Sequence, residues 1–321
     1  MRYVEAGGVR VSAIGVGCWQ FGSREWGYGR GYAATTAIDI VHRALELGVD
    51  LIDTAEIYAF GQSERIVGKA IAGRRDDAFV ASKVFPVLPL EPVVVQRGKA
   101  SARRLGIDMI DLYQVHWPNP VVPIAATMAG MRKLQGEGVI RHVGVSNFSA
   151  DQWRAAEKAL GSPVLSNQVQ YSLAARGPDK AVIPHAQATD RLVIAYSPLA
   201  QGFLGAKYTA SNPPGGVRAT NALFLPENLE RATPLLDALR DVAAAHGATP
   251  AQVALAWVIR RPNVVAIPGA SSVAQLEANV AAATLELTDD DDARLTEASD
   301  RFTPVTGIAA FPQILRARLR R

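Results

Sequence analysis

The sequence has almost no cysteine: Cys18 is the only one in 321 residues. A single thiol excludes an intrachain disulfide framework, which fits a reducing compartment. Long hydrophobic runs are also missing, because no window reaches the ~18 uninterrupted apolar residues of a membrane span. The first ten residues contain Glu5 and no apolar core, so they do not resemble a signal peptide. These absences predict a soluble cytoplasmic protein without a membrane partner.

A surface dominated by one sign of charge is lacking too. The net charge is +4, from 34 basic and 30 acidic residues of mixed order. The only dense basic cluster is in the tail, residues 302–321, and consists of Arg316, Arg318, Arg320 and Arg321. Nucleic-acid binding requires a basic face interleaved with stacking aromatics. We therefore expect no nucleic-acid partner and interpret the tail as a solvated helix.

Four adjacent carboxylates, Asp289 to Asp292, are the one candidate for a metal site. They follow Thr288, however, and acidic residues in the first turn of a helix complement its dipole. The run is therefore predicted to open a helix, and no metal is expected.

What the sequence does contain is an alternation of short β-rich runs and longer helical patterns. The predicted strands cover residues 13–19, 51–54, 78–83, 110–116, 139–146, 164–170, 192–197 and 264–269. Between them, "TAIDIVHRALELG" places Ile38, Val41, Ala44 and Leu45 on one helical face, and Gly48 is expected to end that helix. Ser149 and Thr249 are predicted caps of later helices, each with a glutamine three residues on.

Eight strands alternating with helices, without a linker, predict a single (β/α)8 barrel domain over residues 1–321. The rival, a doubly wound sheet, normally carries G-x-G-x-x-G after an early strand, but "GVGCWQ" has Gln20 in place of the third glycine. A short hairpin that turns at Gly7 and Gly8 is expected to cover the bottom of the barrel. Two long segments, 21–36 and 201–228, follow strands one and seven at the end where barrel active sites form.

Ionisable side chains follow three consecutive predicted strands. Asp53 and Tyr58 follow strand two, Lys83 ends strand three and His116 ends strand four. A phenol is a poor acid at neutral pH; a neighbouring ammonium is expected to lower its pKa, and a buried carboxylate to keep that ammonium charged. Tyr58 can then protonate a developing alkoxide while His116 offers the same oxygen a hydrogen bond. Such a cluster is suited to carbonyl reduction with a hydride from a nicotinamide cofactor.

With these residues in place, the chain resembles the aldo-keto reductase family over nearly its whole length. The matching motifs are "DTAEIYAFGQSE", "ASK", "YQVHWP", "GVSNFS", "NQVQYS", "AYSPLAQGFL" and "IPGASSVAQLEAN". The length of the seventh loop resembles the bacterial and potassium-channel β-subunit-like branches. The resemblance implies a (β/α)8 barrel, NADPH and reversible reduction of aldehydes or ketones. It makes Tyr58 the general acid, has Lys83 and Asp53 tune it, and has His116 orient the substrate carbonyl.

The resemblance also implies a set of cofactor contacts. Ser146, Asn147 and Gln168 match groups that hold the nicotinamide carboxamide, Tyr196 matches the ring that stacks on the nicotinamide, and Asp53, Cys18 and Trp19 lie beside it. The remaining positions belong to the pyrophosphate loop and the adenosine-phosphate end: Ser197, Pro198, Leu199, Gln201, Gly202, Gly269, Ser271, Gln275 and Asn279. Without the resemblance, the same residues have structural interpretations. Helix capping or hydrogen bonding at strand ends would account for Ser146, Asn147 and Gln168. Tyr196 would be a core residue, and Cys18 would be a buried, inert thiol.

The chain departs from the family pattern at two places. No Lys or Arg lies between Pro268 and Asn279, where family members often pair with the ribose 2′-phosphate. Arg218 or Lys207 in the long loop is the candidate replacement, and we expect NADP(H) to be preferred with NAD(H) usable. Ala59 stands where the family often has glycine, a change expected to affect the chemistry little.

Substrate contacts and function leave alternatives open. Trp19, Trp26, Tyr28 and Trp117 are expected either to wall a pocket for aromatic or alicyclic carbonyls or to form a structural lid. The leading interpretation is a carbonyl-reducing oxidoreductase. Two alternatives remain: a regulatory subunit that senses nicotinamide nucleotides, and a barrel lyase that uses Lys83 to form a Schiff base. Substrate identity, reaction direction and oligomeric state are not encoded in these motifs.

Overall fold

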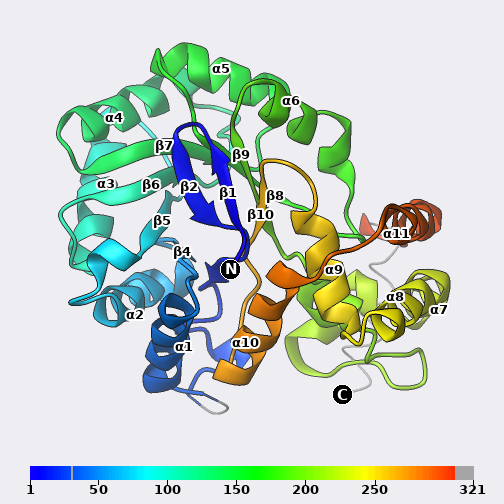
Figure 1. The fold of residues 1–321 in the computed structure, drawn as a ribbon. Coiled ribbons are helices and arrows are strands. Elements are labelled where there is room, and N and C mark those ends of the chain that lie inside the picture. Colours follow the sequence, from blue (N-terminus) through cyan, green and yellow to red (C-terminus); the bar gives the residue numbers. More distant parts are fainter. Residues whose placement is uncertain (30–31, 308–321) are drawn as a thin grey trace.

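The computed structural model describes residues 1–29 and 32–307 (Figure 1). The basic cluster of the tail lies outside the described residues. One parallel eight-stranded sheet has the order β10-β9-β8-β7-β6-β5-β4-β3. Its strands are β3 (Val16–Gly17), β4 (Leu51–Asp53), β5 (Phe79–Val84), β6 (Ile110–Val115), β7 (Ile140–Ser146), β8 (Ser166–Gln170), β9 (Leu192–Tyr196) and β10 (Val264–Ala266). All eight predicted strands are confirmed, most of them one to three residues shorter at an end.

Backbone contacts join the first strand to the last. The Gly15 N–H donates to the Ala266 carbonyl at 2.8 Å, and the Gly17 N–H donates to the Pro268 carbonyl at 3.1 Å. The sheet therefore curls round on itself, and the helices lie outside it (Figure 1). The fold is a (β/α)8 barrel, as the alternation of elements predicts.

Helices separate successive strands. They are α1 (Ala34–Glu46), α2 (Gln62–Ala70), α3 (Glu91–Leu105), α4 (Ile124–Gly136), α5 (Ala150–Leu160), α6 (Val182–Ala188), α7 (Pro226–Arg231), α8 (Thr233–Ala245), α9 (Pro250–Ile259), α10 (Val273–Ala281) and α11 (Asp289–Arg301). The predicted apolar face of α1 needs one correction, because Ile38 is only half-buried while Ala37 and Ile40 are buried. The buried stripe thus follows the i, i+3, i+4 spacing from Ala37, and Ile38 lies on its flank. Gly48 follows α1 with φ +78°, the left-handed conformation expected after a helix end.

The predicted caps are confirmed at three helices. Ser149 and Thr249 each form a reciprocal capping box with a glutamine three residues later. Thr288 does the same with Asp291 at the start of α11, so the four carboxylates do open a helix. Among the described residues, no group of three or more acidic, histidine or cysteine side chains is arranged to hold a metal.

The amino-terminal hairpin, β1 (Tyr3–Ala6) and β2 (Val9–Ser12), covers the end of the barrel where the strands begin (Figure 1). The Gly7 N–H donates to the Asp190 carboxylate ahead of β9 at 3.0 Å, and the Ser12 N–H donates to Asp50 ahead of β4 at 2.7 Å. The predicted bottom cover is therefore confirmed. The opposite end of the barrel stays open to the loops that follow each strand.

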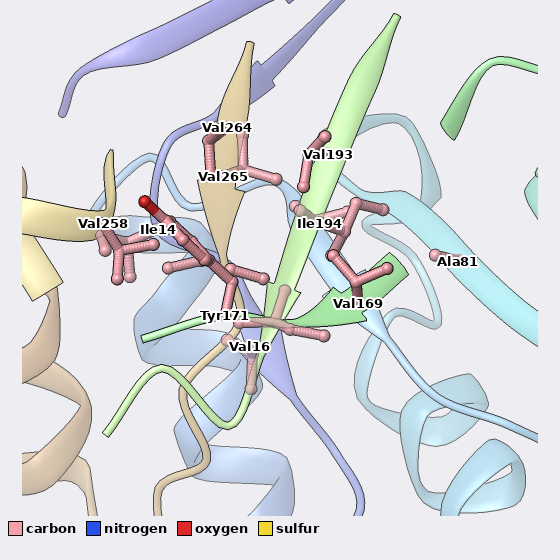
Figure 2. Close-up of a cluster of buried hydrophobic side chains, with 14 of the residues drawn as sticks. Ile14, Val16, Ala81, Val169, Tyr171, Val193, Ile194, Val258, Val264 and Val265 are labelled. Atoms are coloured by element: carbon pink, nitrogen blue, oxygen red, sulfur yellow. The ribbon is translucent and has the colours of Figure 1, made fainter. Parts of the chain in front are cut away.

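Apolar side chains fill the space around the strands. Figure 2 shows Val193 and Ile194 of β9 beside Val264 and Val265 of β10, with Val258 of α9 nearby. All five side chains are buried, because parallel strands of a barrel are covered on both faces.

The two long segments fold into short 3-10 turns and contact each other. The first contains η1 (Arg24–Trp26), and the second contains η5 (Ala200–Gly205), η6 (Gly216–Thr220) and η7 (Ala222–Phe224). The Arg218 guanidinium carbon lies 5.2 Å from the centre of the Trp26 ring. The segments after β3 and β9 therefore meet at the open end.

Within the described residues, no single helix has the length and hydropathy to cross a membrane. The pair α8 and α9 reaches those limits only when both helices are counted together, and a 94° bend separates them.

Candidate active site

A buried ion pair lies at the open end of the barrel. The Lys83 ammonium donates to the Asp53 carboxylate at 2.7 Å and to the Thr54 carbonyl at 2.9 Å. The Lys83 side chain is 0% exposed and that of Asp53 is 2% exposed. Burial lowers the pKa of Lys83, but Asp53 and then Tyr58 more than offset this, so the pKa lies above its ordinary value. Lys83 is therefore a charged ammonium without access to water.

The second oxygen of Asp53 is held from across the barrel. Gln168 of β8 donates to it at 2.7 Å, and Gln114 of β6 donates at 3.4 Å. Since both carboxylate oxygens have donors, the Asp53 side chain is fixed in one orientation. Residues from β4, β5, β6 and β8 thus form one hydrogen-bonded group inside the barrel.

Tyr58 lies within hydrogen-bond reach of this group. The Lys83 ammonium is 3.1 Å from the Tyr58 hydroxyl oxygen. Burial raises the pKa of Tyr58, and Lys83 lowers it only in part, so the net direction is upward. The predicted effect of the ammonium has the expected sign, because Lys83 lowers the pKa of Tyr58, but desolvation outweighs it. Tyr58 is a protonated phenol at neutral pH, with a cation positioned to stabilise its conjugate base.

His116 completes the predicted four and is a neutral imidazole. Its ring centre lies 5.8 Å from that of Tyr58 in an edge-on arrangement, and 4.0 Å from that of Trp117 in a stacked one. Burial, followed by the nearby Lys83 charge, lowers the pKa of His116 to about 2. Its Nδ1 atom is buried and has no hydrogen-bond partner among the described residues. The ring can therefore donate or accept one hydrogen bond without changing its charge.

The backbone after Tyr58 is unusual. Ala59, Phe60 and Gly61 have φ angles of +46°, +55° and +79°, three left-handed residues in succession. That conformation is unfavourable for a residue with a side chain. Alanine in place of glycine at position 59 therefore raises the free energy of this turn. Its methyl group takes no part in the hydrogen bonds described above.

The residues expected to hold a carboxamide lie together but bond to protein groups. The Ser146 hydroxyl donates to the Gln168 carbonyl at 2.9 Å, and the Asn147 amide donates to the His116 carbonyl at 3.0 Å. The Tyr196 hydroxyl donates to the Asn147 side-chain oxygen at 2.9 Å. The alternative, strand-end hydrogen bonding, thus describes their present contacts. Cys18 is fully buried and its thiol donates to the Val16 carbonyl, so it offers no surface to a ligand.

The segment after β9, expected to wrap a pyrophosphate, also has left-handed backbone. Ser197, Ala200 and Gln201 have φ angles of +50°, +48° and +58°, and Gly202 has +91°. Arg218 is directed at this segment, since its Nε atom donates to the Gln201 carbonyl at 2.8 Å. Pro198 and Leu199 lie between these residues. One of the two cations proposed from the sequence is therefore beside the predicted phosphate loop.

The residues expected at the adenosine end lie at the start of α10. Ser272 caps this helix, and the Ser271 N–H and hydroxyl both donate to the Gln275 side chain, at 2.9 and 3.0 Å. Asn279 is buried and donates to the Gly269 carbonyl at 3.4 Å. A Cβ at Gly269 would lie 2.8 Å from the Gln20 amide oxygen, so any larger residue there would require the Gln20 side chain to shift. Gln20 was not predicted as a site residue, and a lone glutamine gives no sequence signal.

The predicted substrate aromatics divide into two kinds. Trp19 is 47% exposed with its ring 5.3 Å from that of Trp26, and Trp117 is 41% exposed. Tyr28 instead packs edge-on against Tyr32 at 5.6 Å and against the core. Three of the four thus lie at the rim, and Tyr28 supports the fold of its segment.

The sequence prediction missed several other apolar side chains at the rim. Among residues 1–29 and 32–307, the large hydrophobic residues with substantial exposure all follow strands β3 to β6: Trp19, Ile57, Phe60, Val87, Leu88, Leu90, Trp117 and Val121. Phe60 is 95% exposed and Val121 is 85% exposed. These side chains share one end of the barrel, and exposed apolar side chains that gather in one region often belong to a binding site. Their only sequence signal is the run "FPVLPL", which reads equally well as core.

Comparisons with known proteins agree with this geometry. The model of the Aldo/keto reductase family matches residues 13–300. An uncharacterized oxidoreductase of Mycobacterium tuberculosis is 57% identical over 307 residues, 95% of either chain. The methylglyoxal reductase YeaE of Escherichia coli is 35% identical, over 91% of this chain and 93% of that protein.

Solved structures give the same result. An aldo/keto reductase of Klebsiella pneumoniae in complex with NADP and acetate is 32% identical, with a TM-score of 0.75 over 92% of this chain and 94% of that one. The glycerol dehydrogenase of Gluconobacter oxydans is 28% identical, with a TM-score of 0.86 over 95% of this chain and 97% of that one.

Proposed function

The chain belongs to the aldo/keto reductase family, and from that premise we propose that it reduces aldehydes or ketones with NADPH, Tyr58 donating the proton. The observation that carries the proposal is the contact of the Tyr58 hydroxyl with Lys83 at 3.1 Å, with Lys83 itself paired to Asp53 at 2.7 Å. A purely structural tyrosine would not need a buried ammonium beside its oxygen.

The roles follow from the state of each group. Tyr58 is protonated at neutral pH, which is the form a general acid requires. An alkoxide is a far stronger base than a phenolate, so the proton transfer is favourable even with a raised phenol pKa. Lys83 then stabilises the phenolate, and Asp53 keeps Lys83 charged and oriented. His116, neutral at every pH near 7, offers a hydrogen bond to the reacting oxygen.

The described residues fit a nicotinamide dinucleotide in two places. Ser146, Asn147 and Gln168 bring hydroxyl and amide groups to the ends of β7 and β8, the donors and acceptors that a carboxamide needs. The amino end of α10 beside Ser271 favours an anionic group. NADPH, when bound, supplies the hydride.

The preference for NADP(H) over NAD(H) is proposed to be modest. Arg218 lies at Gln201, in the loop expected to wrap the pyrophosphate, and supplies one cation from outside residues 268–279. NADPH and NADH both carry the pyrophosphate, so even a charge-assisted hydrogen bond from this arginine does not distinguish them. Only a contact to the ribose 2′-phosphate would, and no Lys or Arg lies between Pro268 and Asn279. NADP(H) is preferred and NAD(H) is usable in this proposal.

The substrate is proposed to be a carbonyl compound with an apolar body. Trp19, Trp26 and Trp117 lie at the rim, and apolar residues of the loops after β4 to β6 extend it. The relative that acts as a methylglyoxal reductase shows that a small carbonyl also belongs in the tested panel.

The test is the steady-state oxidation of NADPH and of NADH with a panel of aldehydes and ketones, comparing wild type with Tyr58→Phe. We expect turnover by wild type and a loss of about 10²- to 10⁴-fold in kcat for the variant, with cofactor binding retained. Tight NADPH binding without turnover of any carbonyl would instead favour the nucleotide-sensing subunit. Covalent trapping of Lys83 by borohydride with a carbonyl would favour the lyase.

A further inference from the structure

Charged side chains outside the barrel wall fasten the segment that carries Tyr58. Glu56 precedes Tyr58 by two residues and Glu64 follows it by six. The Glu56 carboxylate accepts from the Phe85 N–H at 2.5 Å, and the Glu64 carboxylate accepts from the Ser82 hydroxyl at 2.6 Å. Ser82 and Phe85 lie on either side of Lys83. Both ends of the Tyr58 segment are therefore tied to the residues that flank its lysine partner.

Helix α3 supplies the counter-charges. Arg97 contacts both oxygens of Glu56, at 2.7 and 3.1 Å, and also donates to the Phe85 carbonyl at 2.7 Å. Arg104 pairs with Glu64 at 2.5 Å. The carboxylate side chains are 9% exposed at Glu56 and 0% at Glu64, so water cannot replace these partners without opening the structure.

The network acts on a segment that needs support. The backbone from Ala59 to Gly61 is left-handed throughout, and Phe60 is 95% exposed, so the side chains of this turn do little to hold it. The Glu56 N–H adds a long contact to the Lys83 carbonyl, at 3.4 Å. On the inner side the Ser63 hydroxyl donates to the Cys18 carbonyl at 2.8 Å and lies 2.8 Å from the Thr54 hydroxyl. The outer network adds to these contacts, and it is the part of the support that reaches the residues flanking Lys83.

We propose that Glu56 is a positioning residue, which together with Arg97 holds the Tyr58 hydroxyl within hydrogen-bond distance of Lys83. The inference rests on the proposed role of Tyr58 as proton donor, and it extends the functional site to a second group of residues behind the sheet. Glu56 acts through the backbone directly after β5, at Phe85, and through the turn that it begins.

The chain provides a matched control at the other end of the same strand. Asp111 accepts from the Val80 N–H at 2.9 Å and pairs with Arg75 at 2.6 Å, and its side chain is 5% exposed. Glu56 and Asp111 thus make the same kind of contact, a carboxylate between a backbone N–H and an arginine, with the N–H directly after β5 for Glu56 and within β5 for Asp111. Only Glu56 belongs to the segment that carries Tyr58.

The experiment compares Glu56→Gln with Asp111→Asn. Every oxygen of Glu56 accepts from a donor, so an amide nitrogen there meets another donor and breaks one side of the network. We expect Glu56→Gln to lower kcat by roughly 10- to 100-fold, since displacements near 1 Å cost that much, with KM and NADPH affinity within about twofold of wild type. Asp111→Asn is expected to lower the thermal midpoint and leave kcat unchanged.

A second measurement works without any turnover. Ultraviolet difference titration of each protein against its own Tyr58→Phe counterpart reports the pKa of Tyr58. Because Lys83 lowers this pKa, separation of the two groups in Glu56→Gln should move the titration to higher pH. If wild type has no carbonyl reductase activity, the proposed function fails, and this titration still decides whether Glu56 positions Tyr58.

Two outcomes would overturn the inference. One is a Glu56→Gln protein whose Tyr58 titration matches that of wild type, and the other is a loss of stability equal to that of Asp111→Asn with kcat unchanged. Should Glu56→Gln fail to fold, Arg97→Lys replaces it, since lysine keeps the charge but cannot contact both carboxylate oxygens in the fixed guanidinium geometry. The same shift and the same loss of kcat are expected.

Discussion

The two ends of the barrel bury charge in different ways. At the open end, Lys83 and Asp53 form a pair with side chains 0% and 2% exposed. At the closed end, Arg75 and Asp111 form a pair of similar length in which the arginine is 30% exposed. Removing both charges from water is expensive, whereas a half-solvated pair costs little to form. The open end therefore carries a cost in stability that the closed end avoids.

The same contrast appears in the apolar side chains. A hairpin covers the closed end, whereas Phe60, Leu88 and Val121 are left exposed around the open end. Left-handed non-glycine residues also gather there, after β4 and β9. Proteins accept such local costs mainly where they bind or react. One end of this barrel thus avoids such local costs, and the other end has the features that proteins normally keep for binding or reaction.

The sharpest way to test this contrast is to remove the cation at each end. Lys83→Met leaves Asp53 buried without its ion, so we expect the free energy of unfolding to fall by about 3–5 kcal/mol. Arg75→Met should cost only about 1 kcal/mol, because Arg75 is partly solvated and Arg141 lies 3.8 Å from Asp111. Urea unfolding of both variants measures the difference. Equal losses at the two ends would contradict the comparison.

The second largest expected effect is a loss of folding stability at acid pH, caused by His116 at the open end. The folded pKa of His116 is about 2 and that of an unfolded histidine is near 6.5, so below pH 6.5 the unfolded chain binds the extra proton first. This contribution to stability is complete above pH 6.5 and is lost as the pH falls towards 2. At pH 5 the loss is about 2 kcal/mol.

The measurement is denaturant unfolding of wild type and His116→Gln at pH 7 and pH 5. The pKa of His142, in β7, is also lowered by burial, so His142→Gln is the matched control. We expect the acid loss to shrink in His116→Gln more than in His142→Gln. An identical acid loss in wild type and His116→Gln would show that the pKa of His116 is the same in the folded and the unfolded protein.

The smallest predicted effect is at the closed end. Gly7 has φ +60°, and a Cβ there would lie 2.5 Å from the Leu165 side chain. Gly7→Ala should therefore cost about 1–2 kcal/mol. Gly8→Ala separates the cost of the left-handed backbone from the cost of the steric clash, since Gly8 has φ +78° but a Cβ there would meet nothing within 4 Å. Both variants should keep wild-type kcat, and a change in kcat would show that the hairpin acts on the open end.

Much of the fold and the central four residues could be predicted from the sequence. The strands are short apolar runs between helices, and Asp53, Lys83 and His116 each stand at a strand end, so the parallel topology alone brings them to one rim. Tyr58 follows from the same logic, because only a few residues separate it from Asp53. Ser149, Thr249 and Thr288 were readable as caps from local spacing.

What the sequence could not provide depends on burial and on distant partners. The direction of the Tyr58 pKa follows from desolvation, which no motif reports. Glu56 and Arg97 are ordinary charged residues until the fold places them 2.7 Å apart, 41 positions from each other in the chain. The exposure of Phe60 and Leu88 could not be predicted either, since apolar residues after a strand normally suggest a core.

The left-handed turn after Tyr58 has a consequence for protein engineering. Glycine at position 59 or 60 would relieve a backbone that alanine and phenylalanine adopt unwillingly, so libraries selected for heat resistance should accumulate it there. Glycine at position 59 is also the residue that the family often has there, so this substitution is expected to leave kcat unchanged. Selection for thermostability would thus return the turn to the family pattern.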